Sequence, residues 1–222
     1  MKKKTARDAK RRKGVKANRK SVPQEPSPAS RRPAPSGSAK AEIRRLKAKL
    51  AEAMVRIEQL QTSADTDFLL DIPNRRGFER ELNRATSYIK RYRAGGALIV
   101  LDIDRLKPIN DTFGHAAGDQ VLKAIAGVLS RQIRASDVIG RLGGDEFGLL
   151  LWNLTEADAH AKAAALENDI DRLSFVFDGR AVGTGASTGV AVLGPQSDPL
   201  RALEQADCAM YVRKAQRRHE VT

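Results

Sequence analysis

The sequence contains a single cysteine, Cys208, and it has no apolar run long enough to cross a membrane. One cysteine excludes an internal disulfide and is compatible with a reducing compartment. No stretch approaches the roughly 18 apolar residues of a transmembrane segment, and the N-terminus lacks the apolar core of a signal peptide. We therefore expect a soluble, cytoplasmic protein. Its 222 residues, 41% of them hydrophobic, can form one well-buried domain with extensions.

Acidic and aromatic residues are scarce in the first 40 positions. This segment holds 14 of the 40 Lys and Arg residues but 2 of the 27 acidic ones, which gives it +12 of the total net charge of +13. Its basic and Pro/Ser-rich composition predicts a disordered tail over residues 1–39. Such a tail can attract nucleic acid or an anionic membrane, or it can be solvated without a dedicated partner. The lack of aromatic residues argues against base stacking.

Residues 40–63 carry a heptad pattern, with charged residues between the apolar ones. The apolar positions alternate at spacings of three and four: Ile43, Leu46, Leu50, Ala53, Ile57 and Leu60. This pattern predicts a helix that joins two chains into a homodimer through a parallel coiled coil over residues 43–60. The alternative is a helix that packs its apolar stripe onto its own domain. Residues 64–222 then form the main domain.

Residues 141–151, RLGGDEFGLLL, place two glycines and two acids between apolar segments. The pattern is typical of a β-hairpin. Gly143 and Gly144 lack a Cβ atom, so a bulky ligand can approach the backbone closely. Asp145 and Glu146 can reach the mouth of a site at this turn. Taken alone, these residues also fit an ordinary hairpin with solvated acids.

A second acidic pair ends the apolar run at residues 98–104, LIVLDID. A continuous apolar run is typical of a buried central strand, and two carboxylates at its end indicate a cation. Asp102 and Asp104 are two positions apart and therefore share one face of the strand. Oxygen ligands from Asp102 and Asp145 suit Mg²⁺ bound together with substrate phosphates. The pair therefore points to phosphoryl or nucleotidyl transfer assisted by metal ions.

Local patterns also predict the helices and a smaller hairpin. Asn74 is placed to cap a helix that runs to about residue 91. Apolar spacing predicts a helix over 116–134, Thr155 and Asp158 open another that ends near 173, and a last helix covers 199–218. The sequence also predicts a short pair of strands, over residues 174–177 and from residue 180 onward, joined by a turn at Asp178 and Gly179.

The segment 141–147, RLGGDEF, resembles the signature of the GGDEF family, the diguanylate cyclases. The resemblance extends over about residues 67–219, through five separated motifs in the family's order. The other four are DFLLDIPNRRGF at 67–78, DRLKPINDTFGHAAGD at 104–119, TGASTGVAVL at 184–193 and ADCAMY at 206–211. The predicted elements give an antiparallel-rich sheet whose helices cover one face. The resemblance implies an α+β fold, the nucleotidyl-cyclase variant of the ferredoxin-like fold, in which a sheet is flanked by helices.

The resemblance also implies an activity, the condensation of two GTP molecules into cyclic di-GMP with release of pyrophosphate. Each domain of a dimer would hold one half of the reaction centre. Asp102, the carbonyl of Ile103 and Asp145 would hold two Mg²⁺ (or Mn²⁺) ions per active site, with Glu146 as a further ligand or a base. The catalytic signature comprises Gly143, Gly144, Asp145 and Glu146.

Substrate contacts are implied by the same resemblance. Lys107 would bind the terminal phosphates, and Lys214 and Arg218, one helical turn apart, would stabilise their charge. Asn110 and Asp119 would read guanine, since a carboxylate can accept from its ring N–H and its amine together. His115 is expected to orient groups by hydrogen bonding and not to act as an acid or base. The implied substrate-binding residues are Lys107, Asn110, His115, Asp119, Gly144, Lys214 and Arg218.

Arg134 and Asp137 form an RxxD pattern five residues before the two glycines. At this spacing the resemblance implies a product-inhibition site for cyclic di-GMP, and a guanidinium suits guanine edges and phosphate. An RxxD pattern alone is commonly a surface ion pair. A different class of function, a non-catalytic cyclic di-GMP receptor, would keep this site, and a third possibility is a basic-tail tether with the domain as passenger.

Several residues depart from the family pattern. Asp71 stands where the family usually has glycine and would add a charge near the nucleotide site. Arg213 replaces the usual alanine and Arg217 the usual glycine, so we expect the end of the last helix to be extended or shifted. Arg141, which the family commonly keeps, is expected to brace the hairpin.

Overall fold

The computed structural model describes residues 37–220, with side chains described for 38–58 and 64–219. It divides into two units, residues 1–50 and 51–222. Residues 1–36 of the predicted tail lie outside the described residues. Residues 37–39, which were predicted to belong to the tail, open helix α1 (Gly37–Asp65). Within the described part of the chain, no helix has the length and apolarity that a bilayer span requires.

Helix α1 carries the heptad pattern, and its apolar side chains face solvent. Ile43, Leu46, Leu50 and Ile57 are each at least 47% exposed. The sixth heptad position, Leu60, has a side chain outside the described set. An amphipathic helix normally buries its apolar stripe against another element, and the stripe of α1 is exposed.

The main sheet has four antiparallel strands in the order β2 (Val138–Arg141), β3 (Glu146–Trp152), β1 (Gly96–Asp104) and β6 (Gly185–Leu193). Strand β1 is central, as its apolar run predicts, and β2 with β3 forms the predicted hairpin. Asp102 pairs with Glu146 of β3 and with Ser187 of β6. The register therefore brings the acidic end of β1 beside the glycine-containing turn.

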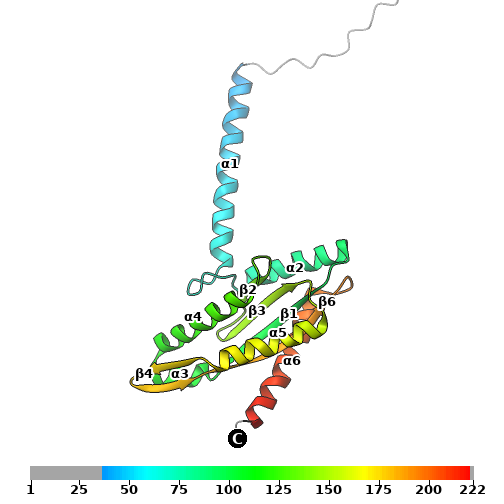
Figure 1. The fold of residues 1–222 in the computed structure, drawn as a ribbon. Coiled ribbons are helices and arrows are strands. Elements are labelled where there is room, and N and C mark those ends of the chain that lie inside the picture. Colours follow the sequence, from blue (N-terminus) through cyan, green and yellow to red (C-terminus); the bar gives the residue numbers. More distant parts are fainter. Residues whose placement is uncertain (1–36, 221–222) are drawn as a thin grey trace, which may run out of the picture. The chain divides into compact units, whose positions relative to one another are not determined.

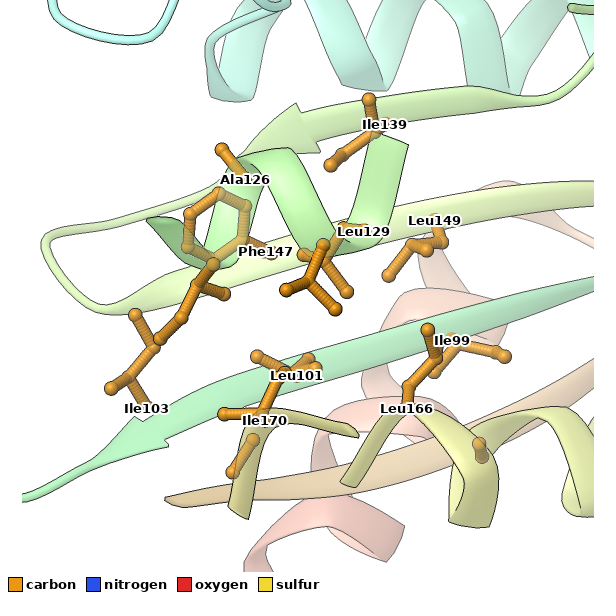
Figure 2. Packing of buried hydrophobic residues seen from close by; sticks show 14 of the residues in the cluster. Ile99, Leu101, Ile103, Ala126, Leu129, Ile139, Phe147, Leu149, Leu166 and Ile170 are labelled. Atoms are coloured by element: carbon orange, nitrogen blue, oxygen red, sulfur yellow. The ribbon is translucent and has the colours of Figure 1, made fainter. Parts of the chain in front are cut away.

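Helices cover both faces of this sheet (Figure 1). Helices α3 (Leu106–Phe113), α4 (His115–Gln132) and α5 (Glu156–Asp171) lie on one face, and α2 (Arg75–Tyr92) and α6 (Pro199–Glu220) lie on the other. Figure 2 shows Ile99 and Leu101 of β1 packed with Leu129, Phe147, Leu149 and Leu166. Leu98 and Val100 point into the opposite cluster. The prediction of helices on one face was wrong, because a strand that is apolar on both sides needs cover on both.

The predicted caps and the small hairpin are confirmed. The side chain of Asn74 accepts a hydrogen bond from the Gly77 amide at 3.1 Å, and Thr155 accepts one from the Asp158 amide at 3.2 Å. Strands β4 (Ser174–Phe177) and β5 (Arg180–Gly183) flank a turn in which Asp178 and Gly179 both have positive φ, as a tight two-residue hairpin turn requires. Helix α6 ends at Glu220, two residues beyond its predicted end.

Candidate active site

The glycine-containing turn is held by Arg141, at the end of β2. Its Nε donates to the Gly143 carbonyl at 3.0 Å and its Nη2 to the Gly144 carbonyl at 2.7 Å. Its Nη1 lies 3.2 Å from a carboxylate oxygen of Asp67. One planar guanidinium with donors in fixed directions thus fixes both glycine carbonyls. Arg141 braces the hairpin, as the sequence predicts.

The acidic end of β1 meets this turn. The Ile103 amide donates to the Asp145 carbonyl at 2.9 Å, which places Asp145 beside Asp102 and Ile103. Asp102 is only 7% exposed, and its carboxylate contacts the ammonium of Lys214 on α6. Burial raises the pKa of Asp102; Lys214 opposes this shift, and the negative charges of Asp145 and Asp104 add to it. These acids crowd one another and favour a compensating cation.

The donor set at this point fits a hard divalent cation. Asp102 and Asp145 supply carboxylate oxygens, and the Ile103 backbone supplies a carbonyl. Among the described side chains, those of residues 38–58 and 64–219, there is no cluster of three or more His, Cys, Asp or Glu that could hold a metal ion. Two carboxylates leave coordination positions for substrate oxygens, which is how Mg²⁺ is commonly bound in phosphoryl-transfer sites.

A cavity of about 610 Å³ opens beside these acids. Five of the residues that the sequence assigned to the site line it: Ile103, Lys107, Asp145, Lys214 and Arg218. Its remaining lining residues are Asp104, Arg105, Leu106, Pro108, Asp171, Thr184, Gly185 and Arg217. Five of these thirteen residues are Lys or Arg, so the cavity suits an anionic ligand.

The N-terminal turn of α3 forms one wall of this cavity. Arg105 precedes the helix in a left-handed conformation, with φ of 66°, and this lets the chain turn sharply from β1 into α3. Leu106, Lys107 and Pro108 follow in the wall. Backbone amides at the start of a helix lack intrahelical partners and attract phosphate oxygens.

Other predicted substrate residues lie outside the cavity lining. Asn110 is on α3, and its Oδ1 is buried without a hydrogen-bond partner among the described residues. A Cβ atom on Gly118 of α4 would collide with that oxygen, so the glycine leaves room for it. Asp119 is half-buried on α4, and His115 opens the same helix with an exposed side chain.

Glu146 follows the two glycines and folds back over the turn. Its Oε2 lies 3.5 Å from Nη2 of Arg75, and it occupies the space that a Cβ atom on Gly143 would need. Burial raises the pKa of Glu146, the charge of Asp207 adds to the shift and Arg75 opposes it. A carboxyl group with a raised pKa is better suited to accept a proton.

The RxxD segment forms a tight turn at the start of the hairpin. Asp137 accepts hydrogen bonds from the backbone amides of Arg134 at 2.9 Å and Trp152 at 3.1 Å. The Arg134 side chain is exposed, and the carboxylate of Asp137 is bound to these two backbone amides.

Asp71, which departs from the family pattern, lies in the loop before α2 with φ of 54° and is not among the residues that line the cavity. Sequence reasoning also missed Asp171, Thr184 and Gly185, which line the cavity. Arg217 also lines the cavity, and the one sequence feature that drew attention to it was that it replaces the glycine usual in the family.

Comparison with known proteins places these features in a family. A family model described as "Diguanylate cyclase, GGDEF domain" matches residues 64–220. The chain is 41% identical over 161 residues to diguanylate cyclase TpbB of Pseudomonas aeruginosa (strain UCBPP-PA14), which covers 72% of this chain and 37% of TpbB. It is 35% identical over 174 residues to probable diguanylate cyclase DgcE of Escherichia coli (strain K12), which covers 78% of this chain and 16% of DgcE. The chain thus spans well under two thirds of these relatives.

Solved structures agree with this match. The coiled coil and GGDEF domain of DgcB from Caulobacter crescentus, in complex with c-di-GMP, superposes with a TM-score of 0.69 at 27% identity, covering 81% of this chain and 95% of that one. The GGDEF domain of TpbB from Pseudomonas aeruginosa (PAO1) gives a TM-score of 0.63 at 41% identity, covering 68% of this chain and 89% of that one.

Proposed function

The chain belongs to the family of GGDEF-domain diguanylate cyclases, and on this premise we propose that it condenses two GTP molecules into cyclic di-GMP with release of pyrophosphate. The observation that carries the proposal is the buried Asp102 beside Asp145, at the rim of a cavity lined by five cationic residues. An acidic centre next to a cationic cavity can hold a cation and a polyphosphate together.

Members of this family generally use divalent metal ions. In this chain Asp102, the Ile103 carbonyl and Asp145 would hold two Mg²⁺ (or Mn²⁺) ions. When bound, such ions lower the pKa of an attacking ribose 3′-hydroxyl and offset charge on the phosphates. Glu146, whose pKa burial raises, would accept the hydroxyl proton or serve as a further ligand. Gly144, where a Cβ atom would meet nothing within 4 Å, leaves the turn accessible to the nucleotide.

The cationic residues would bind the substrate's phosphates. Lys107 lies in the α3 wall of the cavity, and Lys214 and Arg218 line it from α6. Lys214 contacts Asp102 and also lines the cavity, which supports a role for its ammonium between the acids and the substrate's phosphates. Preorganised cations at this position stabilise the charge that develops on pyrophosphate as it leaves.

Guanine recognition would fall to α3 and α4. The carboxylate of Asp119 can accept from the guanine ring N–H and the amine together, and Asn110 on α3 would complete the pair. His115, at the start of α4, would orient the nucleotide by hydrogen bonding. Adenine carries no amine or ring N–H in the same positions, so these contacts favour GTP over ATP.

Two copies of the chain must face each other, because each domain would present one GTP. The exposed stripe of α1 supports a homodimer through a coiled coil over residues 43–60. In a parallel arrangement Glu42 of one helix lies near Lys47 of the other, whereas an antiparallel arrangement centred on the stripe would bring Lys49 near Arg56. The charges therefore support the parallel form. Leu50→Asp should give a monomer by analytical ultracentrifugation, and a dimer that survives this change would contradict the assignment.

Product inhibition would use Arg134 and Asp137. The solved domain of DgcB is in complex with c-di-GMP, and here the Arg134 side chain is exposed on the Asp137 turn. Arg134→Ala should weaken inhibition by added cyclic di-GMP without lowering the initial rate. A contact of the basic tail with nucleic acid or an anionic membrane stays a prediction, because residues 1–36 lie outside the described part.

Pyrophosphate release tests the proposed activity and its base preference together. With Mg²⁺ present, the full chain should release pyrophosphate from GTP and not from ATP. Asp119→Ala should lose most of the rate of pyrophosphate release from GTP. The difference between the rates on GTP and ATP should therefore become smaller. Equal release from both nucleotides by the wild-type chain, or none from GTP, would contradict the proposal.

A further inference from the structure

Arg217 of α6 lies at the centre of a group of carboxylates that the activity proposed above does not use. Its Nε donates to Asp104 at 3.3 Å, its Nη2 donates to Asp171 at 2.6 Å, and its Nη1 lies 3.6 Å from Glu167. Its side chain is 19% exposed. All three nitrogens of the guanidinium therefore face carboxylates that belong to β1 and α5.

Glu167 extends the group to the edge of the sheet. It is 5% exposed, and its Oε1 accepts from the amide of Thr188 at 2.8 Å and from the hydroxyl at 2.7 Å. Its Oε2 accepts from Nε of Arg213 at 3.1 Å and from Nη2 at 3.0 Å. Two arginines one helical turn apart thus tie α6 to α5 and, through Glu167, to β6. Charge-assisted bonds of this kind are strong when buried.

Gly185, at the start of β6, makes room for Arg217. A Cβ atom at this position would lie 2.9 Å from Nη2 of Arg217 and 2.9 Å from Oδ1 of Asp171. Real Cβ atoms essentially never come closer than 3.0 Å to other heavy atoms. The glycine and the arginine therefore fit each other, although they are far apart in the sequence.

Arg217 is also adjacent to the residues assigned to the phosphates. Lys214 precedes it by three positions and Arg218 follows it directly, and all three line the cavity of about 610 Å³. Arg213 instead lines a different cavity, of about 310 Å³, with Glu167 and Thr188. The two arginines thus share Glu167 but face different spaces.

We propose that Arg217 is a positioning residue: it holds the C-terminal turns of α6 against β1 and α5, so that Lys214 and Arg218 face the substrate's phosphates. The inference rests on the proposed function for the identity of the substrate. Helix ends fray unless other groups fix them, and a misplacement of about 1 Å in a positioning group can reduce a rate by as much as 100-fold. Because its nitrogens already face carboxylates, Arg217 acts through its neighbours and not as a phosphate ligand.

The test compares Arg217→Ala with Arg213→Ala in the full chain. We expect Arg217→Ala to raise KM for GTP about tenfold and to weaken calorimetric binding of pyrophosphate with Mg²⁺ by a similar factor. Arg213→Ala loses contacts to the same Glu167 and should lower thermal stability while KM stays within about twofold of wild type. Arg217→Lys keeps the charge but loses the planar fork, so it should not restore KM.

Gly185→Ala tests whether the position of the Arg217 guanidinium matters when its charge is kept. The new methyl group crowds Nη2 of Arg217 and Oδ1 of Asp171 and leaves the charge of the guanidinium in the protein, so KM should rise, although by less than in Arg217→Ala. The double variant should show much less than the product of the two single effects, because both act on one arrangement. An unchanged KM in Arg217→Ala, an equal rise in Arg213→Ala, or full rescue by lysine would overturn the inference. Failure of the wild-type chain to make cyclic di-GMP would instead refute the proposed function, and pyrophosphate binding would still decide the role of Arg217.

Discussion

Gly189 on β6 is the position where α6 comes closest to the sheet. A Cβ atom there would lie 2.9 Å from Cα of Met210, and closer still to the Ala206 carbonyl oxygen and the Met210 amide nitrogen. These are backbone atoms, so no side-chain rotation can relieve the contact. Gly189→Ala would therefore force α6 away from β6 by about 1 Å, a displacement that a close-packed core resists.

The cost follows from what α6 buries. Ala202, Leu203, Ala206 and Met210 form part of the core on that face of the sheet, each no more than 7% exposed. Overpacking usually costs 1–3 kcal/mol, and because a backbone must move here we expect about 3 kcal/mol or more. The same helix carries Lys214 and Arg218, so cyclase activity of the folded fraction should fall by up to about 100-fold.

Urea unfolding followed by circular dichroism measures this effect, and Gly183→Ala is the matched control. Gly183 lies on β5, and a Cβ atom there would have no atom within 4 Å. The control should stay within about 1 kcal/mol of wild type. The contact between β6 and α6 is not as described if Gly189→Ala has the same urea midpoint of unfolding as wild type. An equal loss of unfolding free energy in the Gly183→Ala control would contradict it too.

Three further changes have defined outcomes. Asp71→Gly should raise the free energy of unfolding by about 0.5–1 kcal/mol in urea titrations, because Asp71 holds a φ of 54° that glycine adopts without strain. Glu167→Ala should cost about 3–5 kcal/mol in the same assay, because it leaves Arg213, Arg217 and Thr188 without their shared carboxylate. Burial raises the pKa of Asp207, with Arg75 opposing and Glu146 nearby, so the neutral carboxyl favours the folded state and this contribution is lost as the pH rises through the raised pKa. Asp207→Asn should therefore be more stable than wild type at pH 7, by less than about 1 kcal/mol after solvent screening, and melting curves should converge as the pH falls below the ordinary value of 3.8.

Local patterns in the sequence were enough for the elements that frame the site. The apolar run that ends at Asp102 predicted a central strand, and the glycines at 143 and 144 predicted the hairpin beside it. Asn74 and Thr155 predicted two helix starts, because a cap depends on residues within one turn of it. Local pattern also indicated Asp102 and Asp145 as cation ligands. The Ile103 carbonyl and the substrate-binding residues, in contrast, came from the family resemblance.

Contacts between distant segments could not be predicted in this way. Arg217 and Asp104 are separated by 113 positions, and no periodicity links them. The second helical layer was missed for a related reason, because an apolar strand shows that both of its faces are buried but does not say which helices bury them. The side chains around the cavity are positioned by such contacts between distant segments and by the packing of helices on both faces of the sheet.

Mass-spectrometric detection of the product tests the central claim most directly. The purified full chain, first stripped of bound cyclic di-GMP, is incubated with GTP and Mg²⁺ alongside Asp145→Ala. We expect cyclic di-GMP from the wild-type chain and at least about a 100-fold lower rate from the variant, because the change removes a carboxylate from the acidic centre. No product from stripped, dimeric wild-type chain, or an undiminished rate from Asp145→Ala, would contradict the account.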